Sequence, residues 1–381
     1  MNDFVFSYPT KVYFGDGAAQ RALESELGHY GRRVMLCRGL RSAEESGVYA
    51  AIHAMLIAQG KEVIDFPGIM PNPTYAKVQQ GAALARESGA DFILALGGGS
   101  VIDCCKVIAA QAKLGEDIWD MENLHHRFPT KAIPVGAVVT ASGTGAEMNG
   151  GAVITHEEKL WKGGIFAFAP VFAALDANYT LTVPRMQVFS GAFDTLSHAM
   201  ETYFGTSDAD NVSDDVALAV MRSTVVNIRR LLRDINDIQA RRNLMWDSAM
   251  AENGILKLGR VTDFQAHQIE HQLGAYTDCN HGQGLAVIQP AYYRHILKDA
   301  EEKFSRLARV VFDAEDAPSG LAALEGLIEA CALPTRLGQL SSRVPITPAL
   351  LREVADSTNI IRTGPRTLDN DEIYAILLEC L

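Results

Sequence analysis

Short apolar runs alternate with stretches of helical periodicity through roughly the first 180 residues. Five of these runs are predicted strands, at residues 10–14, 33–37, 61–66, 92–96 and 132–139. The segments between them, such as 74–88, carry apolar residues at helical spacing. Strands that alternate with such helices form βαβ units, and these units build a parallel sheet. The first half of the chain is therefore predicted to be α/β, with a Rossmann-like parallel sheet.

The second half has a different pattern, because long helical stretches follow Pro184 without an intervening β-branched run. Helices are predicted at residues 185–204, 214–240, 242–258, 262–276, 286–297 and 299–312. The change in pattern predicts a domain boundary near residue 182. Residues 1–182 would form the α/β domain and residues 183–381 an all-helical domain.

Composition narrows the class of protein. The formal net charge of −12 argues against a nucleic-acid partner, since phosphate contacts need clustered Lys and Arg. No apolar stretch approaches the roughly 18 residues that a membrane span needs, and the acidic start MNDF does not resemble a signal peptide. Six cysteines, with Cys104 and Cys105 adjacent, fit a reducing cytoplasm. We expect a cytoplasmic protein of enzyme size that binds neither nucleic acid nor membrane.

Two glycine-rich turns follow predicted strands. GGGS at 97–100 lies between the strand 92–96 and a helical run, where free backbone N–H groups attract a pyrophosphate. Its spacing is not GxGxxG, so a simple tight turn is the alternative. TASGTG at 140–145 follows the strand 132–139 and places hydroxyl groups between glycines. Two such turns in one sheet favour a dinucleotide over two ordinary connecting loops.

A carboxylate and several imidazoles recur at helical spacing in the second half. Asp194 and His198 are four residues apart, as are His267 and His271, so each pair projects from one helix face. His281 lies in a turn that opens the next predicted helix. Together they would form a nitrogen and oxygen site suited to Fe(II), Zn(II) or Mn(II). Taken singly, each residue also has an ordinary structural interpretation, and about 70 residues separate the two halves of the group.

Several ordered motifs carry a resemblance to a known family. They are PNPT at 71–74, GGGSVIDCCK at 97–106, TASGTGAE at 140–147, GAFDTLSHAME at 191–201, HQIEH at 267–271 and HGQG at 281–284. Over nearly its whole length the chain resembles the iron-containing (group III) alcohol dehydrogenases. Residues 147–149 and 201–203 are nearest to the branch of NADPH-dependent butanol dehydrogenases and broad aldehyde reductases. The resemblance implies a dehydroquinate synthase-like fold, with a dinucleotide-binding domain at 1–182 and a helical metal-binding and catalytic domain at 183–381.

Position by position, the resemblance implies a set of site residues. The expected ligands of Fe²⁺ or Zn²⁺ are Asp194, His198, His267 and His281. His271 would lie near the metal without binding it. The expected pyrophosphate contacts are Gly98, Gly99, Ser100 and Asp103, with Asn72 nearby. Thr140, Ser142, Thr144 and Lys162 would contact the nicotinamide half or its ribose. A homodimer, formed through an exposed edge strand at 10–14, is also expected.

The turn after the second strand bears on the choice between NADPH and NADH. Family members that select NAD carry an aspartate there, whereas this chain has RGLRS at 38–42. Gly39 and Ser42 are expected to contact the cofactor, and Arg38 and Arg41 would attract a 2′-phosphate. The sequence therefore favours NADP(H), with NAD(H) as the alternative. Solvated loop arginines are the other interpretation of this turn.

The predicted activity is hydride transfer between a nicotinamide cofactor and a short or medium-chain aldehyde or alcohol. A metal would polarise the carbonyl, and a proton would arrive by way of His271 or water. The alternatives are a glycerol-like polyol dehydrogenase and a dehydroquinate-synthase-like lyase. The lyase needs a basic cluster for a phosphorylated sugar acid, and its metal ligands are usually one Glu with two His. A non-catalytic binding protein is the third class considered.

Overall fold

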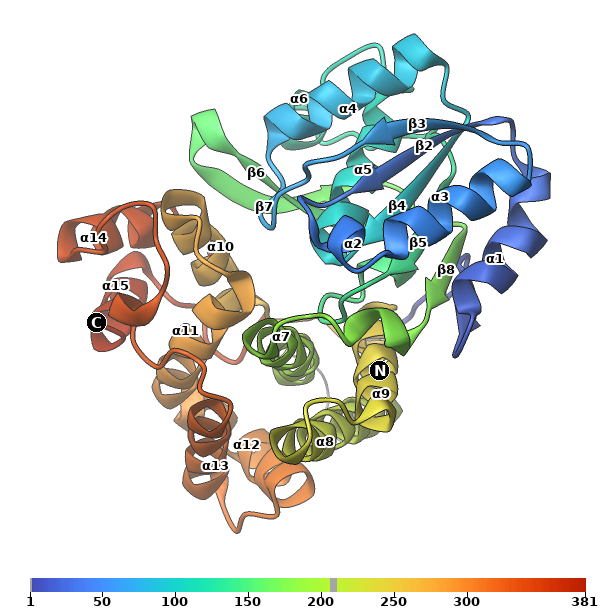
Figure 1. Ribbon diagram of the computed structural model, residues 1–381. Coiled ribbons are helices and arrows are strands. Elements are labelled where there is room, and N and C mark those ends of the chain that lie inside the picture. Colours follow the sequence, from blue (N-terminus) through green and yellow to red (C-terminus); the bar gives the residue numbers. More distant parts are fainter. Residues whose placement is uncertain (1, 206–210) are drawn as a thin grey trace. The chain divides into compact units, whose positions relative to one another are not determined.

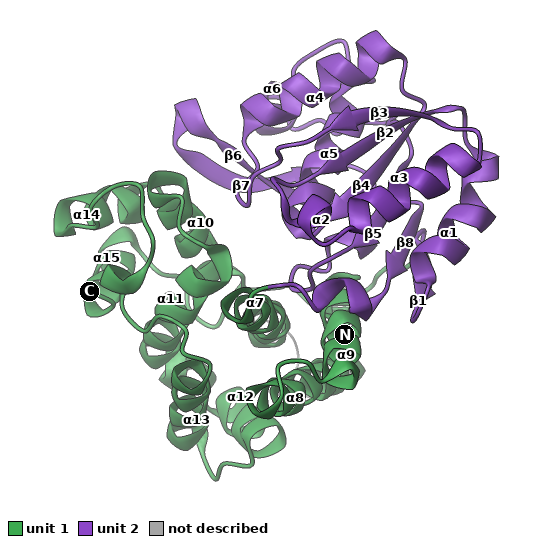
Figure 2. Ribbon diagram, in the orientation of Figure 1, with its two compact units in different colours: residues 1–6, 184–381 green, residues 7–183 purple. Residues whose placement is uncertain are grey.

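The computed structural model describes residues 2–205 and 211–381 (Figure 1). The chain divides into two compact units (Figure 2). One comprises residues 7–183, and the other comprises residues 184–381 together with the first six residues. The first unit contains a parallel sheet and the second is helical, which confirms the predicted fold class. Within the described ranges, no helix has both the length and the apolar character that a membrane span requires.

The sheet of the α/β unit has six strands in the order β1-β8-β5-β4-β2-β3, and every neighbouring pair is parallel. The strands are β1 (Lys11–Phe14), β2 (Arg33–Arg38), β3 (Glu62–Phe66), β4 (Phe92–Gly97), β5 (Val135–Val139) and β8 (Phe172–Leu175). The central strands are almost wholly buried, because helices cover both faces. The five predicted strands are confirmed, with ends shifted by one to three residues.

Helices pack on the two sides of this sheet. They are α1 (Ala18–Glu26), α2 (Ser42–Glu45), α3 (Val48–Ala58), α4 (Tyr75–Ser88), α5 (Gly99–Gln111) and α6 (Ile118–Asn123). The core of one face joins α1 and α3 to alternate residues of β2 and β4, such as Val34 and Leu94. In Figure 1, α4 lies on the opposite face, and it packs against α5. This is the doubly covered arrangement that the βαβ pattern predicts.

Three observed strands, β6, β7 and β8, were not predicted from the sequence. β8 is only four residues long and two of these are alanine, so its apolar run is weak. β6 (Gly151–His156) and β7 (Trp161–Phe166) form an antiparallel hairpin outside the main sheet. The second of these strands contains Gly163 and Gly164, and its pattern does not alternate clearly between apolar and polar residues. Weak β propensity therefore hid β7 and β8, whereas β6 has β-branched residues and was missed although its signal was present.

Strand order places three turns at one edge of the sheet. β4 pairs with β2 on one side and with β5 on the other. Arg38 is opposite Leu96, and Gly97 is opposite Val139, so the turns after these strands begin next to one another. The connections from β2 and from β4 leave in opposite directions, which creates the switch point where open α/β sheets bind ligands.

The helical unit is built around α7 (Arg185–Phe204), which is buried over nearly its whole circumference from Phe189 onward. A helix that is apolar or buried all round belongs in the centre of its domain. The other helices are α8 (Val212–Arg233), α9 (Ile238–Glu252), α10 (Gln265–Thr277), α11 (His281–Ile296), α12 (Glu301–Leu307), α13 (Ala317–Ala330), α14 (Pro348–Ser357) and α15 (Asn370–Glu379).

Four predicted helices differ clearly in extent from the observed ones. The helices predicted at 242–258 and 286–297 are α9 (Ile238–Glu252) and α11 (His281–Ile296), and the two others are interrupted or change type. The predicted helix 214–240 is interrupted after Arg233, and α9 begins at Ile238 because Asp237 caps it by accepting hydrogen bonds from Gln239 N (3.1 Å) and Ala240 N (3.0 Å). The predicted helix 299–312 ends as an α-helix at Leu307 and continues as a π-helical turn over Ala308–Phe312.

Candidate metal centre and nucleotide turns

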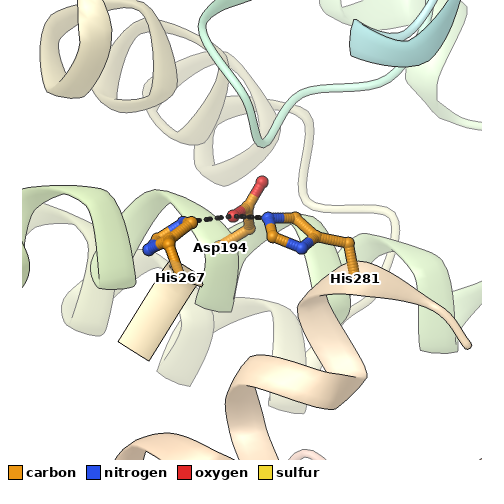
Figure 3. A group of neighbouring side chains, drawn as sticks. All are labelled: Asp194, His267 and His281. Carbon is orange, nitrogen blue, oxygen red and sulfur yellow. Dashed lines mark ion pairs between the residues drawn. The ribbon is translucent and has the colours of Figure 1, made fainter. Parts of the chain in front are cut away.

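Three helices of the helical unit bring a carboxylate and two imidazoles together (Figure 3). Asp194 lies on α7, His267 on α10, and His281 is the first residue of α11. One potential ligand atom from each lies within 4.8 Å of the others. The Nε2 atoms of His281 and His267 are 3.3 and 3.7 Å from Asp194 Oδ1. The structure thus joins the two halves of the predicted group, which the sequence alone did not show to meet.

His198 lies beside these three residues, one turn after Asp194 on α7. Its Nδ1 atom is 3.6 Å from Asp194 Oδ1, and its ring centroid is 4.6 Å from that of His267. All four predicted metal ligands therefore surround one carboxylate. That these four residues coordinate a metal ion stays a prediction.

The carboxylates at this centre favour positive charge beside them, which a proton on His267 supplies in the absence of a metal ion. Burial raises the pKa of Asp194, but the facing imidazoles outweigh it and hold the pKa well below its usual range. Burial lowers the pKa of His267, but the carboxylates of Glu201 and Asp194 outweigh it and raise the pKa to about 10. Burial lowers the pKa of His198. An ionised, buried carboxylate is thus kept among imidazoles, and a bound divalent cation could take the place of the proton on His267.

The donor atoms themselves test whether a divalent metal fits. Asp194 Oδ1, His198 Nδ1 and His267 Nε2 are buried and accept or donate no hydrogen bond within the part of the chain that the structure describes. Buried polar atoms are nearly always paired, so a cluster of such atoms converging on one point requires an explanation. One carboxylate oxygen and several imidazole nitrogens are a ligand set that Fe(II) and Zn(II) accept. The residues present fit such an ion.

His271 lies close to the cluster of Asp194, His267 and His281 but is not one of its members. Its ring centroid is 5.8 Å from that of His267 and 5.3 Å from that of His281. With Glu270 and His281 it forms a second set of potential ligand atoms within 4.8 Å of one another. This position agrees with a histidine near the metal centre, and its predicted part in proton transfer stays a prediction.

Two glycines of the HGQG motif allow α11 to begin at this place. A Cβ atom on Gly282 would lie 2.3 Å from the carbonyl oxygen of Ser190 on α7. A Cβ atom on Gly284 would lie 2.9 Å from Cγ of Glu270 on α10. Any larger residue would push the start of α11, and with it His281, away from both neighbouring helices.

In the α/β unit, the predicted cofactor turns follow β4 and β5 and pack against each other. Gly98 is the N-cap of α5, so the turn presents the free N–H groups of a helix start. A Cβ atom on Gly99 would lie 2.2 Å from Oγ1 of Thr144, and Thr140 N donates to Gly97 O at 3.0 Å. The two turns thus form one surface whose close packing requires glycine.

Other predicted cofactor residues have partners within the α/β unit. The Ser100 hydroxyl donates to the Pro71 carbonyl, which connects α5 to the PNPT loop beside buried Asn72. Asp103 Oδ2 accepts from Val153 N at 2.9 Å, and its Oδ1 pairs with Lys106 Nζ at 3.0 Å. Asp103 therefore holds the β6–β7 hairpin, whatever it contributes to the pyrophosphate.

The remaining predicted contacts lie in three places. Ser142 is partly exposed in the turn after β5, and Lys162 is buried on β7 opposite Thr155. Gly39 and Ser42 flank the turn between β2 and α2.

Lys106, the last residue of the GGGSVIDCCK motif, is a residue to which no role was assigned from the sequence. A lysine in an otherwise apolar helical run was the available signal.

The turn after β2 differs from its expected chemistry in one respect. Arg38 is buried and pairs with Glu44 at 2.5 Å and with Asp65 at 3.2 Å. It also stacks over the Tyr49 ring at 4.2 Å. Because two carboxylates already neutralise it, Arg38 is not a free cation for a 2′-phosphate. The side chain of Arg41 is exposed.

A doubly covered parallel sheet with glycine-rich turns and a helical unit with a carboxylate–imidazole centre define a class, the metal-dependent dehydrogenases that use a nicotinamide nucleotide. Comparison with known families identifies the member of that class. Residues 9–177 match the family "Iron-containing alcohol dehydrogenase", and residues 188–381 match "Fe-containing alcohol dehydrogenase family, C-terminal". The chain belongs to the iron-containing alcohol dehydrogenase family, as its motifs predicted.

Individual relatives agree with this assignment. The chain is 37% identical over 343 residues to the probable NADH-dependent butanol dehydrogenase 1 of Bacillus subtilis, covering 89% of this chain and 88% of the relative. It is 32% identical over 366 residues to the NADPH-dependent aldehyde reductase YqhD of Escherichia coli, covering 93% and 94%. The crystal structure of NADH-dependent butanol dehydrogenase A from Thermotoga maritima superposes with a TM-score of 0.93 at 30% identity, covering 100% of this chain and 99% of that one.

These relatives confirm the predicted class of activity. The protein is an oxidoreductase that interconverts alcohols and aldehydes with a divalent metal and NAD(P)(H). They do not favour the lyase or the polyol dehydrogenase, and a non-catalytic binding protein is excluded as well.

Proposed function

We propose that the protein reduces short and medium-chain aliphatic aldehydes to alcohols, and catalyses the reverse reaction, with the metal bound by Asp194, His198, His267 and His281. The observation that carries the proposal is the convergence of Asp194, His267 and His281, with His198 Nδ1 3.6 Å from Asp194 Oδ1. The donor atoms of Asp194, His198 and His267 are buried without a hydrogen bond among the described residues. The names of the butanol dehydrogenases and of the aldehyde reductase support the substrate class. The α/β unit, residues 7–183, would bind the dinucleotide.

A divalent metal at this centre supplies Lewis-acid polarisation of the carbonyl, and a bound reduced nicotinamide supplies the hydride. The chain's own residues contribute position and charge. Asp194 keeps a negative charge in a desolvated pocket, which favours a cation there. The helix start at Gly98 and Gly99 provides N–H groups for the pyrophosphate. His271, whose ring centroid is 5.8 Å from that of His267, would hand a proton to the forming alcohol oxygen.

For the choice of cofactor, we propose that Arg41 and Ser42 carry a preference for NADPH. Arg38 is not available to a 2′-phosphate, because it already pairs with Glu44 and Asp65. Arg41 lies three residues later in the same turn with an exposed side chain, and Ser42 is the first residue of α2. An arginine and a hydroxyl at a helix start are suited to a phosphate monoester.

The test is an assay of the anaerobically purified protein. Metal analysis should find one equivalent of divalent metal per chain. Addition of butanal should then consume the absorbance of reduced nicotinamide, with a higher kcat/KM for NADPH than for NADH. Glycerol in the reverse direction should be a poor substrate. Protein that retains one metal per chain but does not oxidise either reduced cofactor with any aliphatic aldehyde would refute the proposed substrate class.

We also propose that the protein is a cytoplasmic homodimer that pairs through β1. Among the described residues, β1 pairs only with β8, so its outer edge is open, and Phe14 at its end is 41% exposed. An open, partly apolar edge strand is a template for pairing with a second copy. The six cysteines are free and buried, which fits a reducing compartment. Light scattering should give a dimer for the wild type and a monomer for Val12→Pro, whereas a dimeric variant would refute this interface.

A further inference from the structure

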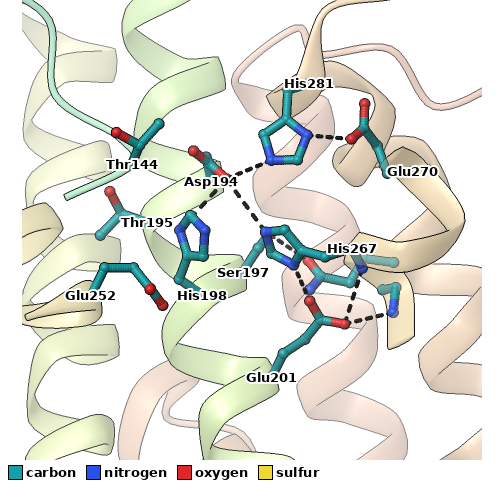
Figure 4. A network of polar contacts seen from close by, with 12 residues as sticks. Thr144, Asp194, Thr195, Ser197, His198, Glu201, Glu252, His267, Glu270 and His281 are labelled. Atoms are coloured by element: carbon teal, nitrogen blue, oxygen red, sulfur yellow. Dashed lines mark hydrogen bonds and ion pairs between the residues drawn. The ribbon is translucent and has the colours of Figure 1, made fainter. Parts of the chain in front are cut away.

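Two buried glutamates lie directly behind the imidazoles of the metal centre (Figure 4). Glu201 is the last residue of the GAFDTLSHAME motif on α7, and Glu270 lies within the HQIEH motif on α10. Both side chains are fully buried. Two fully buried carboxylates are costly to keep unless they have specific partners. Neither glutamate is among the metal ligands or the proton donor of the proposed function.

Glu201 fixes His267 through both its backbone and its ring. One carboxylate oxygen accepts a hydrogen bond from Ala266 N at 2.6 Å and from His267 N at 3.3 Å. The other accepts from Nδ1 of the His267 ring. The N-cap residue of α10, Phe264, has a positive φ of 62° and makes no side-chain cap, so Glu201 supplies this cap from another helix. The same carboxylate thus sets where α10 begins and how its histidine is turned.

Glu270 holds His281 in a corresponding way. Its Oε2 atom accepts a hydrogen bond from Nδ1 of His281. Gly284 leaves the space that the Glu270 side chain occupies, because a Cβ atom there would lie 3.0 Å from Oε1. The second glycine of the HGQG motif is therefore required for this contact as well as for the close approach of α11.

These bonds determine which ring nitrogen faces Asp194. A histidine whose Nδ1–H donates to a carboxylate has its Nε2 lone pair directed away from that carboxylate. Nε2 of His267 and Nε2 of His281 are the atoms that lie 3.7 and 3.3 Å from Asp194 Oδ1. Each carboxylate also adds negative charge behind its imidazole, which makes the ring a stronger donor to a cation. His198 is different, since its nearby carboxylate Glu252 pairs instead with Lys257 at 2.7 Å.

We infer that Glu201 and Glu270 are positioning residues of the metal centre, which fix the tautomer and orientation of His267 and His281 so that Nε2 of each is presented to a divalent cation. The inference rests on the ligand set of the proposed function. It assigns a purpose to both glutamates of the two motifs, and it predicts that metal affinity depends on residues that do not touch the metal.

The test uses the full-length protein, stripped by a chelator and titrated with Co²⁺ in competition with that chelator. Glu201→Gln and Glu270→Gln should each bind Co²⁺ about 10- to 100-fold more weakly than the wild type. The glutamine amide oxygen can still accept from Nδ1–H, so Glu270→Leu, which removes the acceptor, should bind more weakly than Glu270→Gln. The matched control is Asp247→Asn, a buried carboxylate of the same unit whose described partner is Thr224, and it should bind Co²⁺ as the wild type does.

A purely structural role would lower the melting temperature of the metal-free protein and leave the Co²⁺ affinity of the folded protein unchanged. Wild-type affinity in Glu270→Leu as well as in both glutamine variants would therefore overturn the inference, because the leucine variant has no acceptor for Nδ1–H. The stoichiometry is also decisive, because Glu270, His271 and His281 form a second set of potential ligands. Two Co²⁺ ions per chain, with one lost in Glu270→Gln, would make Glu270 a ligand and overturn its role in positioning.

Failure of the proposed function gives a different result. If Asp194→Ala and His267→Ala bind Co²⁺ as tightly as the wild type, the ligand set itself is wrong and the inference falls with it. If these two variants lose Co²⁺ while the two glutamate variants retain it, the ligand set stands and only the inference fails. The expected result, a large loss in the ligand variants and a graded loss in the glutamate variants, supports both.

Discussion

The buried ammonium of Lys106 lies 3.0 Å from the carboxylate of Asp103, one turn earlier on α5. Lys106 Nζ also donates to Ala146 O at 2.9 Å and to Asn149 Oδ1 at 3.2 Å. Asp103 in turn accepts from Val153 N. This pair therefore joins the helix that follows the first glycine turn to the loop and hairpin that follow the second. The end of the GGGSVIDCCK motif holds the two turns in register with each other.

Lys106→Met should destabilise the α/β unit and loosen the cofactor turns. Removing one partner of a buried ion pair leaves Asp103 uncompensated, at a cost of about 3–5 kcal/mol. We expect a melting temperature lower by roughly 10 °C and a larger effect on the KM for reduced nicotinamide than on kcat. Calorimetry and steady-state kinetics measure the two effects. Lys131→Met, at an exposed lysine, is the control, and equal stability of the two variants would show that the buried pair contributes nothing.

The sequence was sufficient for the parts of the fold that follow from periodicity. The helix 185–204 was predicted with its observed bounds, because its apolar residues recur on all faces between Pro184 and Gly205. The interruption at 234–237 was missed because Asp237 caps α9 inside a continuous helical pattern. The four-residue strand β8 and the glycine-containing strand β7 carry too little β signal to be recognised, whereas β6 was missed despite its β-branched residues.

At the site, the sequence identified residue types but not their partners. The spacing of Asp194 and His198 fixed one helix face, and only the packing of α7 against α10 and α11 shows that His267 and His281 meet it. For the same reason, the ion pairs of Arg38 were not predicted from the sequence. Its neighbour Glu44 is close in sequence, but Asp65 comes from the adjacent strand β3, and no local pattern predicts that these two partly exposed carboxylates will pair with the arginine.

Arg41→Ala should reduce the preference for NADPH. If Arg41 binds the 2′-phosphate, its loss removes one charge-assisted hydrogen bond, and the ratio of kcat/KM for NADPH to that for NADH should fall about tenfold. The kcat/KM for NADH should stay near its wild-type value. Arg38→Ala is the comparison, because it removes the pairs with Glu44 and Asp65. It should lower the melting temperature and leave the ratio of kcat/KM values near that of the wild type. An unchanged ratio in Arg41→Ala would exclude this residue from cofactor selection.

His271→Ala should slow the reaction without removing the metal. A positioned proton donor contributes roughly 10²–10⁴-fold to a rate, so kcat for aldehyde reduction should fall by about 100-fold or more. The metal content of the purified variant should equal that of the wild type, because His271 is predicted not to be a ligand. Metal analysis and kcat are measured on the same preparation. Loss of the metal would make His271 a ligand, and an unchanged kcat would mean that water delivers the proton unaided.

The carboxyl of Asp247 should make the stability of the helical unit depend on pH. Burial between α8 and α9 raises its pKa to about 7, although hydrogen bonds with Ser223 and with Thr224 (3.5 Å) lower it in part. Below about pH 4 the group is protonated in both the folded and the unfolded chain. Between about pH 4 and 7 only the folded chain keeps the proton, so the free energy of unfolding falls as the pH rises through this range. Above pH 7 the penalty of the buried charge is complete.

Asp247→Asn removes the charge while keeping the size and a hydrogen-bonding group of the side chain. The variant should therefore melt at a higher temperature than the wild type at pH 8, by several degrees, and the difference should vanish toward pH 4. The shift of about three pKa units sets a ceiling of about 4 kcal/mol on the gain. Melting curves of both proteins across this pH range measure it, with the exposed Glu329→Gln as the control for a change in net charge. A gain that is the same at pH 4 and pH 8 would show that packing, and not ionisation of Asp247, is responsible.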